Sequence, residues 1–411
     1  MAEKKYAVMD VLYLSYDGMT DPLGQSQVMP YLMGLSKKGL RFHLISFEKP
    51  ERMRTRGEEI AQIMQQAGID WQPLPYTKQP PVLSTLFDIW KMRRKAHQLV
   101  KQHHITVVHC RSYLSALIGL HLKRRLGLKF IFDMRGFWAD ERVEGGLWKL
   151  SNPIYKTIYQ FFKKQEAAFV RESDEAVSLT YAGRDIINNW WPNAAKHFEV
   201  IPCCADMDLF HTDNLNTERL NQLRAAINPS GGLLLSYLGS LGTWYMVKEM
   251  MDFFAVLHRR RPDARLLFIT QDKPEEIYAH AAISGIPPDA VVVRAAARTE
   301  VPYYLALSQY SIFFIRPTFS KNGSSPTKQG ELMGMGIPLI CNTGIGDTDR
   351  IVEQYQSGLL VRGFNESEYE KTVTELLSRQ FKPQAIRSGA IDYFSLDKGV
   401  ERYWGIYQKF K

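Results

Sequence analysis

The chain has 411 residues, more than one ordinary domain of about 100–200 residues holds, so we expect two domains. Hydrophobic residues make up 45% of it, but no segment has the roughly 18 consecutive apolar residues that span a bilayer. Because the first residues also lack the apolar run of a secretory signal, we exclude an integral membrane protein and expect a cytoplasmic one. The formal net charge of +9 suits anionic partners: phosphate-bearing donors, lipid headgroups or nucleic acid. The four cysteines lack the paired spacing of a zinc site, so we expect reduced thiols.

The N-terminal half alternates apolar runs of strand length with longer segments of helical periodicity. The pattern predicts strands at residues 7–14, 42–47, 106–109, 130–134 and 176–179. It predicts helices at residues 26–38, 57–67, 112–126 and 153–170. Strands that alternate with helices indicate βαβ units and therefore a parallel sheet.

A second alternation follows in the C-terminal half. The predicted strands are 233–238, 265–270, 291–293, 312–315 and 338–341, and the predicted helices are 248–260, 301–307 and 331–335. The polar stretch 211–228 separates the two series, so we place the domain boundary near residue 215. Two domains are expected, 1–215 and 216–395. In open α/β sheets ligands bind beyond the carboxyl ends of the strands, and the informative residues should directly follow strands.

Two such loops lie in the first domain. The first holds Asp17 and Gly24 and ends at Ser26, which is suited to cap the next helix, so both a phosphate-binding turn and a plain strand-to-helix turn fit it. The second runs from Asp133 to Glu141. Arg135 offers a fixed charge and five donors, which suit a phosphate, although a structural ion pair with Asp133 or Asp140 is the alternative.

In the second domain, a short turn and a helix start attract attention. The turn after the first strand holds Gly239, Ser240, Gly242 and Thr243. Its backbone amides and hydroxyl groups suit a phosphate, but the turn alone is weak evidence for a phosphate site. The helix start is stronger. Pro326 suits a first helical turn that Ser324 or Ser325 caps, and Lys328 would add a charge to the free amides. Glu331 lies on roughly the same face, where its carboxylate is suited to accept hydrogen bonds from a ribose diol, unless the two form an ordinary surface ion pair.

Four stretches together resemble the family 4 glycosyltransferases. "SPTKQGELMGMGIPLICN" is similar to their P-[ST]-K-x-x-E signature, "FDMRGFWADE" to their R-[DG]-x-W-x-[DE] stretch, "VIPCCADMDLF" to their interdomain segment, and "SLDKGVERYWGIYQKF" to their final helix. They occur in the right order across essentially the whole chain. The resemblance implies an α/β fold of the GT-B type, with two Rossmann-like domains whose parallel sheets face each other across a cleft. A C-terminal helix, residues 396–411, would cross back to the N-terminal domain.

The resemblance also implies roles for individual residues. The C-terminal domain would bind a nucleotide sugar, with UDP as the expected nucleotide, and the N-terminal domain would bind most of the acceptor. Donor binding is expected from Gly24, Gly239, Ser240, Gly242, Thr243, Arg316, Ser325, Pro326, Thr327, Lys328 and Glu331. Direct roles in the reaction are expected for Asp133, Arg135, Lys328 and Glu331, and acceptor contacts for Asp17, Arg111 and Trp138.

Two departures from the family pattern affect the donor site. Gly323 stands where many members have a glutamate that contacts the donor sugar, so the sugar itself is undetermined. Residues 240–245 lack the arginine and lysine that commonly neutralise the diphosphate, and the best replacements are Lys328, Arg316 and Arg135, with Lys248 a weaker one. The implied reaction retains the anomeric configuration. It requires neither a metal nor a cofactor, since the nucleotide sugar is a co-substrate and basic side chains stabilise the leaving group.

The expected acceptor is a glycan or a lipid-linked intermediate in the synthesis of cell-surface polysaccharide or glycoconjugates. Residues 82–100 and 148–164 mix aromatic and aliphatic side chains with basic ones, so each is predicted to be either an interfacial helix on the inner face of an anionic membrane or a core-facing helix with a solvated basic face. No motif for nucleic acid accompanies the charge.

Two other functions fit the same architecture. A nucleotide-sugar 2-epimerase would need acid and base groups in the cleft, where His109 is the histidine most easily placed. A catalytically inactive GT-B binding module is consistent with Gly323, although Arg135, Lys328 and Glu331 argue against it.

Overall fold

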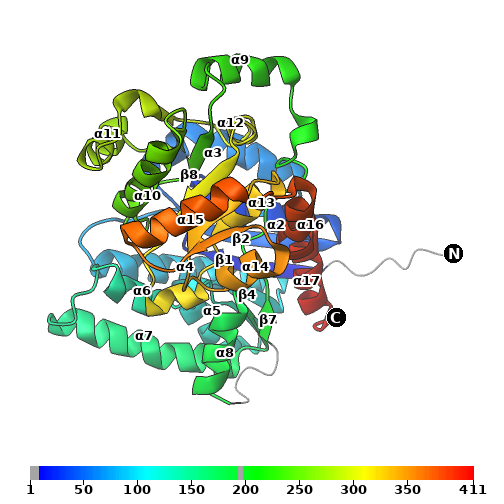
Figure 1. Cartoon of the computed structure of the whole chain (residues 1–411). Coiled ribbons are helices and arrows are strands. Elements are labelled where there is room, and N and C mark those ends of the chain that lie inside the picture. The colour runs from blue at the N-terminus through cyan, green and yellow to red at the C-terminus, as the bar shows by residue number, and fades with distance from the viewer. Residues whose placement is uncertain (1–8, 193–197) are drawn as a thin grey trace. The chain divides into compact units, whose positions relative to one another are not determined.

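The computed structural model describes residues 9–192 and 198–411. The chain forms two compact units, which are unit 1 (Met1–Pro202 with Leu396–Lys411) and unit 2 (Cys203–Ser395). Each has a parallel sheet with helices around it (Figure 1). The chain passes into unit 2 at Cys203, before residue 215. The reason is that the segment after Cys203 packs inside unit 2, where Phe210 is fully buried and Arg387 donates hydrogen bonds to its carbonyl oxygen and to that of Met207.

Unit 1 contains a seven-stranded sheet in the order β3-β2-β1-β4-β5-β6-β7. Its strands are β1 (Met9–Ser15), β2 (Leu40–Glu48), β3 (Asp70–Pro75), β4 (Val107–Arg111), β5 (Lys129–Asp133), β6 (Glu175–Ser178) and β7 (Phe198–Val200). Its helices are α1 (Pro22–Gln27), α2 (Met29–Lys37), α3 (Pro50–Gln66), α4 (Leu83–His103), α5 (Ser112–Leu126), α6 (Trp138–Glu144), α7 (Pro153–Glu172), α8 (Tyr181–Trp190) and α17 (Leu396–Gln408).

Unit 2 contains a six-stranded sheet in the order β10-β9-β8-β11-β12-β13. Its strands are β8 (Leu234–Leu238), β9 (Arg265–Ile269), β10 (Val291–Arg294), β11 (Tyr310–Phe313), β12 (Leu339–Asn342) and β13 (Gly358–Val361). Its helices are α9 (Thr217–Ile227), α10 (Val247–Arg260), α11 (Pro274–Ile283), α12 (Val301–Leu305), α13 (Thr327–Gly334), α14 (Thr348–Tyr355), α15 (Glu366–Ser378) and α16 (Pro383–Phe394).

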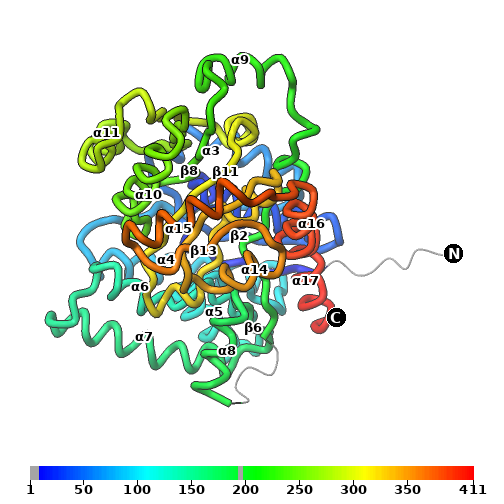
Figure 2. Tube along the Cα trace, viewed as in Figure 1, coloured from blue at the N-terminus to red at the C-terminus, as the bar shows by residue number. Residues whose placement is uncertain are grey.

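The right-handedness of β-α-β connections explains which helices cover which face of the sheet in unit 1. Right-handed β-α-β connections place helices on opposite faces when the strand order runs in opposite directions. The order runs one way from β1 through β2 to β3 and the other way from β4 to β7. The helices α4, α5 and α7 therefore share one face, and α5 packs against both of the others. Figure 2 traces these connections.

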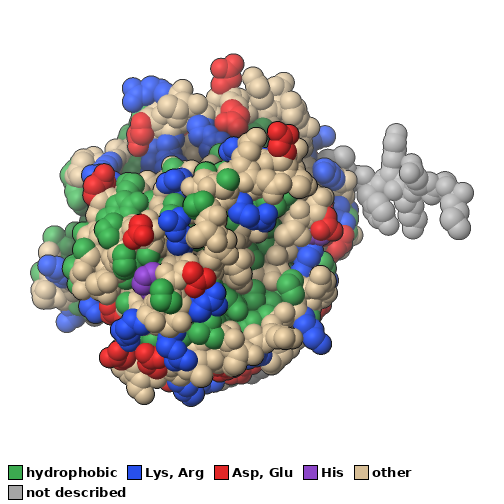
Figure 3. All heavy atoms as spheres, turned by 45° about the horizontal axis from the view of Figure 1, so that its top comes forward, with side chains coloured by type: hydrophobic (Ala, Val, Ile, Leu, Met, Phe, Trp, Pro, Cys, Tyr) green, Lys and Arg blue, Asp and Glu red, His purple; other side chains and the backbone are tan. Residues whose placement is uncertain are grey.

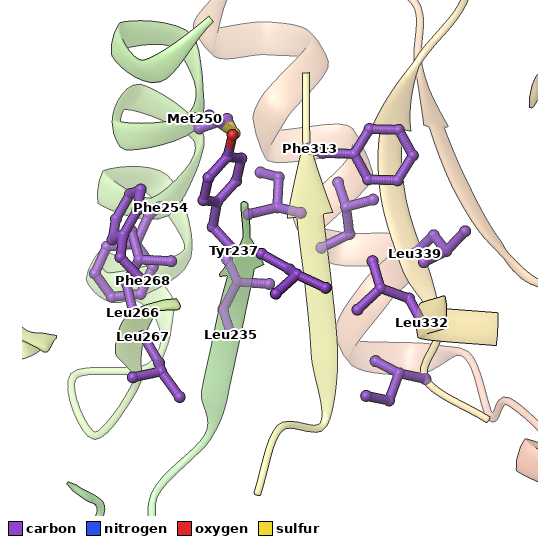
Figure 4. Close-up of a cluster of buried hydrophobic side chains, with 14 of the residues drawn as sticks. Leu235, Tyr237, Met250, Phe254, Leu266, Leu267, Phe268, Phe313, Leu332 and Leu339 are labelled. Carbon is purple, nitrogen blue, oxygen red and sulfur yellow. The ribbon is translucent and has the colours of Figure 1, made fainter. Parts of the chain in front are cut away.

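The core of unit 2 is built from the inward faces of its central strands and of α10 and α13. Tyr237 of β8 and Phe268 of β9 lie with ring centroids 5.3 Å apart, and Met250 and Phe254 of α10 pack on the same side (Figure 4). Strands buried on both faces are read as continuous apolar runs, which is why the sequence pattern located them.

The C-terminal helix α17 belongs to unit 1, as the crossing-back helix of a GT-B fold does. It packs on α2, where a Cβ on Gly34 would lie 2.7 Å from a methyl group of Val400, so a glycine permits the close approach. The ring of Tyr403 lies edge-on to Tyr31, and Arg402 donates a 2.7 Å hydrogen bond to the carbonyl oxygen of Val200. The predicted α/β GT-B architecture, with two Rossmann-like sheets and this helix, is confirmed.

Several local predictions differ from the structure. The stretch 211–228 is not only a polar linker, because residues 217–227 form α9 and bury Leu223 and Ile227. The helix predicted at 26–38 is split into α1 and α2, and Ser26 does not cap it but donates from within α1 to the carbonyl oxygen of Pro22. Trp148 precedes α7 instead of lying in it, since the helix begins at Pro153 after the capping side chain of Asn152.

Among the described residues, no helix is long and apolar enough to cross a membrane. On the face drawn in Figure 3, basic and acidic side chains are interspersed with hydrophobic ones.

Candidate functional site

Both sheets have a switch point, where the strand order reverses and the crossovers leave room for a ligand at the carboxyl edge. In unit 1 this point lies between β1 and β4, and in unit 2 it lies between β8 and β11. The residues predicted for the site follow these strands. Asp17 follows β1, Arg111 ends β4, Gly239 follows β8 and Arg316 follows β11.

Lys328 is the central residue of the candidate site in unit 2. It lies in the first turn of α13, is 6% exposed, and its Nζ has no hydrogen-bond partner among the described residues. The Nζ lies 3.7 Å from the ring centroid of Tyr245 and 4.1 Å from that of Tyr237. Burial lowers the pKa of Lys328 well below that of a free lysine, and the carboxylate of Glu331 only partly offsets this. The structure thus holds an ammonium group in an apolar cage with its hydrogen-bonding capacity unused.

Glu331 lies one turn further along α13 and is also buried. Arg298 donates a 2.9 Å hydrogen bond from Nη1 to its Oε1, which orients the carboxylate. Burial raises the pKa of Glu331, although the charges of Arg298 and Lys328 act in the opposite direction. Arg298 follows β10 and was not predicted, because no motif in the sequence connects it with Glu331.

The start of α13 differs from the predicted cap. The helix begins at Thr327, with Pro326 as the N-cap residue and no side-chain hydrogen bond to the first amides. Ser325 does not cap it but accepts a 3.1 Å hydrogen bond at Oγ from the backbone amide of Cys203. Because a proline at the N-cap has no side-chain acceptor, no capping side chain competes with an anion for the amides of Thr327 and Lys328, whereas the amide of Gln329 donates to the carbonyl oxygen of Pro326 at 3.0 Å.

The turn after β8 lies against the lysine. Gly239 has φ +108°, a conformation that favours glycine, and a Cβ at this position would lie 3.2 Å from the Nζ of Lys328, so the tip of the lysine would have to shift slightly. Ser240, Gly242 and Thr243 are exposed, as a binding turn requires. The side chain of Asp272 holds the turn by accepting a hydrogen bond from the amide of Leu241.

A second group of cations surrounds Trp244 in the same unit. The guanidinium of Arg316 lies 4.8 Å from its ring centroid, and the Nζ of Lys321 lies 3.7 Å from it. Lys321 is buried in the short helix η3 (Phe319–Gly323) and was not predicted. Lys248, the weaker candidate for neutralising the diphosphate, is exposed and pairs with Asp252 at 2.6 Å. This pairing argues against a role for Lys248 in binding the diphosphate.

In unit 1, Asp17 and Arg111 meet at the switch point. The Nε of Arg111 donates a 3.1 Å hydrogen bond to Oδ2 of Asp17. Arg111 is buried and Asp17 is partly exposed, so the pair presents its carboxylate side to solvent. Both were predicted to contact the acceptor.

Asp133 and Arg135 lie beyond β5 in a buried polar cluster. Oδ1 of Asp133 lies 3.9 Å from Nη1 of Arg135, and Oδ2 accepts a 2.9 Å hydrogen bond from the hydroxyl of Tyr403 and lies 3.6 Å from Nε2 of His109. Burial opposes ionisation of Asp133, but the charge of Arg135 and the nearby His109 outweigh it, so its pKa lies below its usual value. Arg135 adopts φ +57°, a strained conformation for a non-glycine residue.

His109 is enclosed by the C-terminal helix. Its Nδ1 lies 2.6 Å from the hydroxyl of Tyr407, and its ring packs at a tilt against Tyr13 with centroids 4.5 Å apart. Burial lowers the pKa of His109, against the influence of Asp133. The sequence could not reveal Tyr403 and Tyr407 as partners of this cluster, since α17 reaches it from the far end of the chain.

Two further predicted residues have packing roles. A Cβ on Gly24 would lie 2.1 Å from the carbonyl oxygen of Gly18, so α1 folds directly onto its own preceding loop. Trp138 lies in an aromatic cluster, with ring centroids 4.9 Å from Phe162 and 5.2 Å from Trp148.

In the described part of the chain, one group of side chains brings metal-ligating atoms together. His43, Asp70 and His103 place such atoms within 4.8 Å of one another in unit 1. Both nitrogens of His43 already face carboxylates, at 2.8 Å from Asp70 and 2.9 Å from Asp10. The group lies away from the residues predicted for catalysis.

Comparison with known proteins gives the family context of these two sites. Residues 28–209 match the family model of Glycosyltransferase Family 4. The match covers most of unit 1 and extends a few residues into unit 2. No curated protein matches the chain by sequence.

Solved structures with the GT-B fold resemble the whole chain. Sucrose-phosphate synthase from Thermosynechococcus elongatus shares 12% identity and a TM-score of 0.73, over 98% of this chain and 99% of that one. A glycosyltransferase from Rickettsia africae shares 15% identity and a TM-score of 0.72, with the same coverage. HepE from Anabaena, solved in complex with UDP and glucose, shares 13% identity and a TM-score of 0.68, over 97% and 99%. At identities this low, the structural similarity shows a shared fold and nothing more.

The contact between Gly239 and Lys328 leads to a first prediction. Replacing Gly239 with alanine should destabilise unit 2 by about 1–3 kcal/mol, because alanine is strained at this φ and its Cβ displaces the lysine. Chemical denaturation measures the loss. The matched control is Gly231→Ala, where φ is +68° and no atom lies within 4 Å of the new Cβ, so only the conformational cost applies. Equal losses in the two variants would show that the contact has no energetic effect.

Proposed function

We propose that the protein is a retaining glycosyltransferase that moves a sugar from a UDP-sugar to a glycan or lipid-linked acceptor. It would act in the cytoplasm, in the synthesis of cell-surface polysaccharide or glycoconjugates. One observation carries the proposal. A buried lysine without a hydrogen-bond partner among the described residues, Lys328, lies in the first turn of α13, next to free helix amides and a buried glutamate.

The leaving group of such a reaction is a nucleoside diphosphate, and its stabilisation is the main catalytic demand. The first amides of α13 are oriented donors for the phosphate oxygens, and the ammonium of Lys328 would gain a partner for its charge. The lysine cage excludes water, which strengthens the interaction between its charge and a phosphate. On this proposal, the groups that stabilise the leaving group would be in place before the substrate binds.

The ribose of the nucleotide would bind at Glu331. A carboxylate accepts hydrogen bonds from both hydroxyls of a diol, and Arg298 fixes its orientation through the 2.9 Å contact. The family glutamate that contacts the donor sugar is replaced by Gly323, which is buried. Backbone groups of this segment would therefore contact the sugar in place of a carboxylate.

The reacting sugar would meet unit 1 at Arg135. Its guanidinium supplies a fixed positive charge for the departing phosphate, and Asp133 holds it from a position that Tyr403 fixes. These side chains would position charge at the reaction centre without a metal ion or another cofactor.

The epimerase alternative requires accessible acid and base groups. His109 is 1% exposed and lies against Tyr407, and burial keeps its pKa below the usual value. A neutral imidazole packed behind the C-terminal helix does not supply the proton transfer that epimerisation needs, so this observation favours the transferase. An inactive binding module would keep nucleotide binding without transfer.

Nucleotide-dependent stabilisation tests the proposal. UDP at about 100 times its dissociation constant should stabilise the protein by about 2.7 kcal/mol, observed as a rise in Tm, and GDP and ADP should do less. Glu331→Ala should remove most of the effect, whereas Glu366→Ala, on the exposed first turn of α15, should keep it. Measuring the release of UDP from a UDP-sugar then distinguishes an enzyme from a binding module. If no nucleotide raises the Tm, the proposal is wrong.

A further inference from the structure

The exposed hydrophobic side chains of this protein are concentrated in two short segments of unit 1. Sixteen large hydrophobic residues are exposed among those described, and half of them lie in the first turns of α4 or around the start of α7. We call this group the α4–α7 surface. It consists of Leu83, Leu86, Phe87, Trp90, Leu147, Leu150, Ile154 and Phe161.

The first two turns of α4 have an inverted orientation, with polar side chains inside and apolar ones outside. Ser84 and Asp88 are buried, whereas Phe87 and Trp90 are 50% and 53% exposed. A core-facing helix has the opposite arrangement. The core-facing reading of this segment therefore does not hold for these turns.

Asp88 explains why α4 cannot rotate to bury its apolar stripe. Its carboxylate accepts a 2.9 Å hydrogen bond from the hydroxyl of Tyr16 and a 3.2 Å hydrogen bond from the amide of Thr77, and it pairs with Lys91 at 2.8 Å. Turning the helix would leave a buried charge without these partners, which costs more than exposing the apolar residues. The outward stripe is thus imposed by the fold.

Basic residues continue the exposed stripe of α4. Phe87 and Trp90 stack with centroids 5.8 Å apart, and the guanidinium of Arg94 lies 5.8 Å from the Trp90 ring. Arg93 and Arg94 are exposed in the next turn. Aromatic rings followed by arginines are typical of a helix that lies at the headgroup level of a bilayer.

The start of α7 repeats the pattern. Residues 147–164 contain four lysines and no acidic residue. Ile154 is 61% exposed in the first turn, and the Asn152 side chain caps that turn by accepting from its amide. Trp148 anchors the loop through its ring contact with Trp138. The loop is therefore ordered while its aliphatic residues face outward.

Both segments lie at the same edge of the sheet. In a parallel sheet each connecting helix starts near the carboxyl ends of the strands. The helices α4 and α7 lie on the same face with α5 between them, so their starts are about 20 Å apart at usual interhelical spacings. Two apolar groups at this spacing, each flanked by cations, form an extended surface with no acidic residue exposed in either segment.

We propose that the α4–α7 surface docks the protein on an anionic lipid bilayer. Charge complementarity identifies the occupant, because an apolar surface bordered by Arg93, Arg94, Lys149, Lys156 and Lys164 fits a layer of acidic headgroups over acyl chains. The same cations would repel a second copy of the surface. The inference extends the proposed function, since a bilayer is where a lipid-linked acceptor is presented, but docking itself does not require transfer.

Cosedimentation with vesicles tests the proposal. The wild-type protein should bind vesicles of phosphatidylcholine with phosphatidylglycerol and bind phosphatidylcholine vesicles at least about tenfold more weakly. The triple variant Leu86→Ser, Phe87→Ser, Trp90→Ser should lose at least about tenfold in affinity for the anionic vesicles. Arg93→Glu with Arg94→Glu should have a comparable effect and lower the salt dependence. The substituted side chains are exposed, so these variants should fold.

The matched control is Leu126→Ser with Arg125→Glu, an exposed apolar and basic pair at the end of α5, at the opposite edge of the sheet. This control should bind anionic vesicles as the wild type does. Unchanged binding of the triple variant would overturn the proposal, and so would a wild-type dimer in solution that the triple variant abolishes without any vesicle binding. UDP-dependent stabilisation of the same variants should be unchanged, because it depends on unit 2. The two proposals can therefore fail separately.

Discussion

Lys328→Met should make the free protein more stable at neutral pH and weaken its affinity for UDP by about 100-fold. Removing one partner of a buried charge pair costs about 2–5 kcal/mol of binding free energy, which accounts for the loss of affinity. The gain in stability has a different origin. The folded state holds Lys328 where its charged form is disfavoured, as its lowered pKa indicates, and methionine removes that cost while keeping the contacts with Tyr237 and Tyr245.

The pH dependence of this stability gain follows from linkage. Between the folded pKa of Lys328 and its unfolded value of about 10.4, the unfolded chain binds more protons at this residue, so wild-type stability rises with pH. The methionine variant lacks this dependence. Its advantage should therefore be largest at low pH and disappear as the pH rises toward 10.4. A depression of one pKa unit corresponds to about 1.4 kcal/mol, or roughly 3–6 °C in Tm for a unit of this size.

The matched control is Lys248→Met. Lys248 lies on α10 just after the turn that follows β8, but it is 62% exposed and paired with Asp252. Neither the stability of this variant nor its affinity for UDP should therefore change appreciably. Thermal unfolding across pH and titration calorimetry with UDP measure both effects. At any pH above the folded pKa of Lys328, UDP binding to the wild type should also take up protons, since the diphosphate favours the charged form. A methionine variant with wild-type UDP affinity would rule out Lys328 as a donor residue.

The strands and helices predicted from sequence are those whose residues carry a strong periodic signal. The central strands of both sheets are buried on both faces and appear as apolar runs. β3 was missed because it is an edge strand, only partly buried and interrupted by Pro73 and Pro75, which are tolerated only at an edge. The helix α9 was missed because only Leu223 and Ile227 of it are buried, and most of its other positions are polar. Edges and surface helices are fixed by tertiary packing that a local pattern does not contain.

The same distinction applies to the candidate sites. Lys328 and Glu331 could be paired from sequence because three residues on one helix place them near the same face. Arg298 and the cage of Tyr237 and Tyr245 could not, since β8, β10 and α13 are brought together only by the order of strands in the sheet. Tyr403 lies 270 residues from Asp133, and only the return of α17 to unit 1 joins them. Local spacing could pair Lys328 with Glu331, whereas the residues that hold them are brought close only by the topology of the fold.

Arg135→Ala should lower kcat by about 100- to 1000-fold while UDP binding stays near the wild-type value. The loss follows from the removal of a fixed charge at the reaction centre, which is the usual effect of deleting a stabilising donor. UDP affinity should persist because the residues proposed to bind the nucleotide, such as Lys328 and Glu331, belong to unit 2. Activity and calorimetric binding, measured on the same preparation, separate these two effects.

Backbone geometry provides the control for this variant. Arg135 has φ +57°, a conformation that costs alanine about 1 kcal/mol or more but costs glycine nothing, so Arg135→Gly should be more stable than Arg135→Ala by about that amount. If the guanidinium is what the reaction needs, the two variants should lose kcat equally despite their different stabilities. If activity instead follows stability, with the glycine variant near wild type, then Arg135 only maintains the loop after β5, and the positive charge at the reaction centre must come from another residue. Since Arg111 and Asp17 form their own pair at 3.1 Å, Arg111 is the first residue to examine in that case.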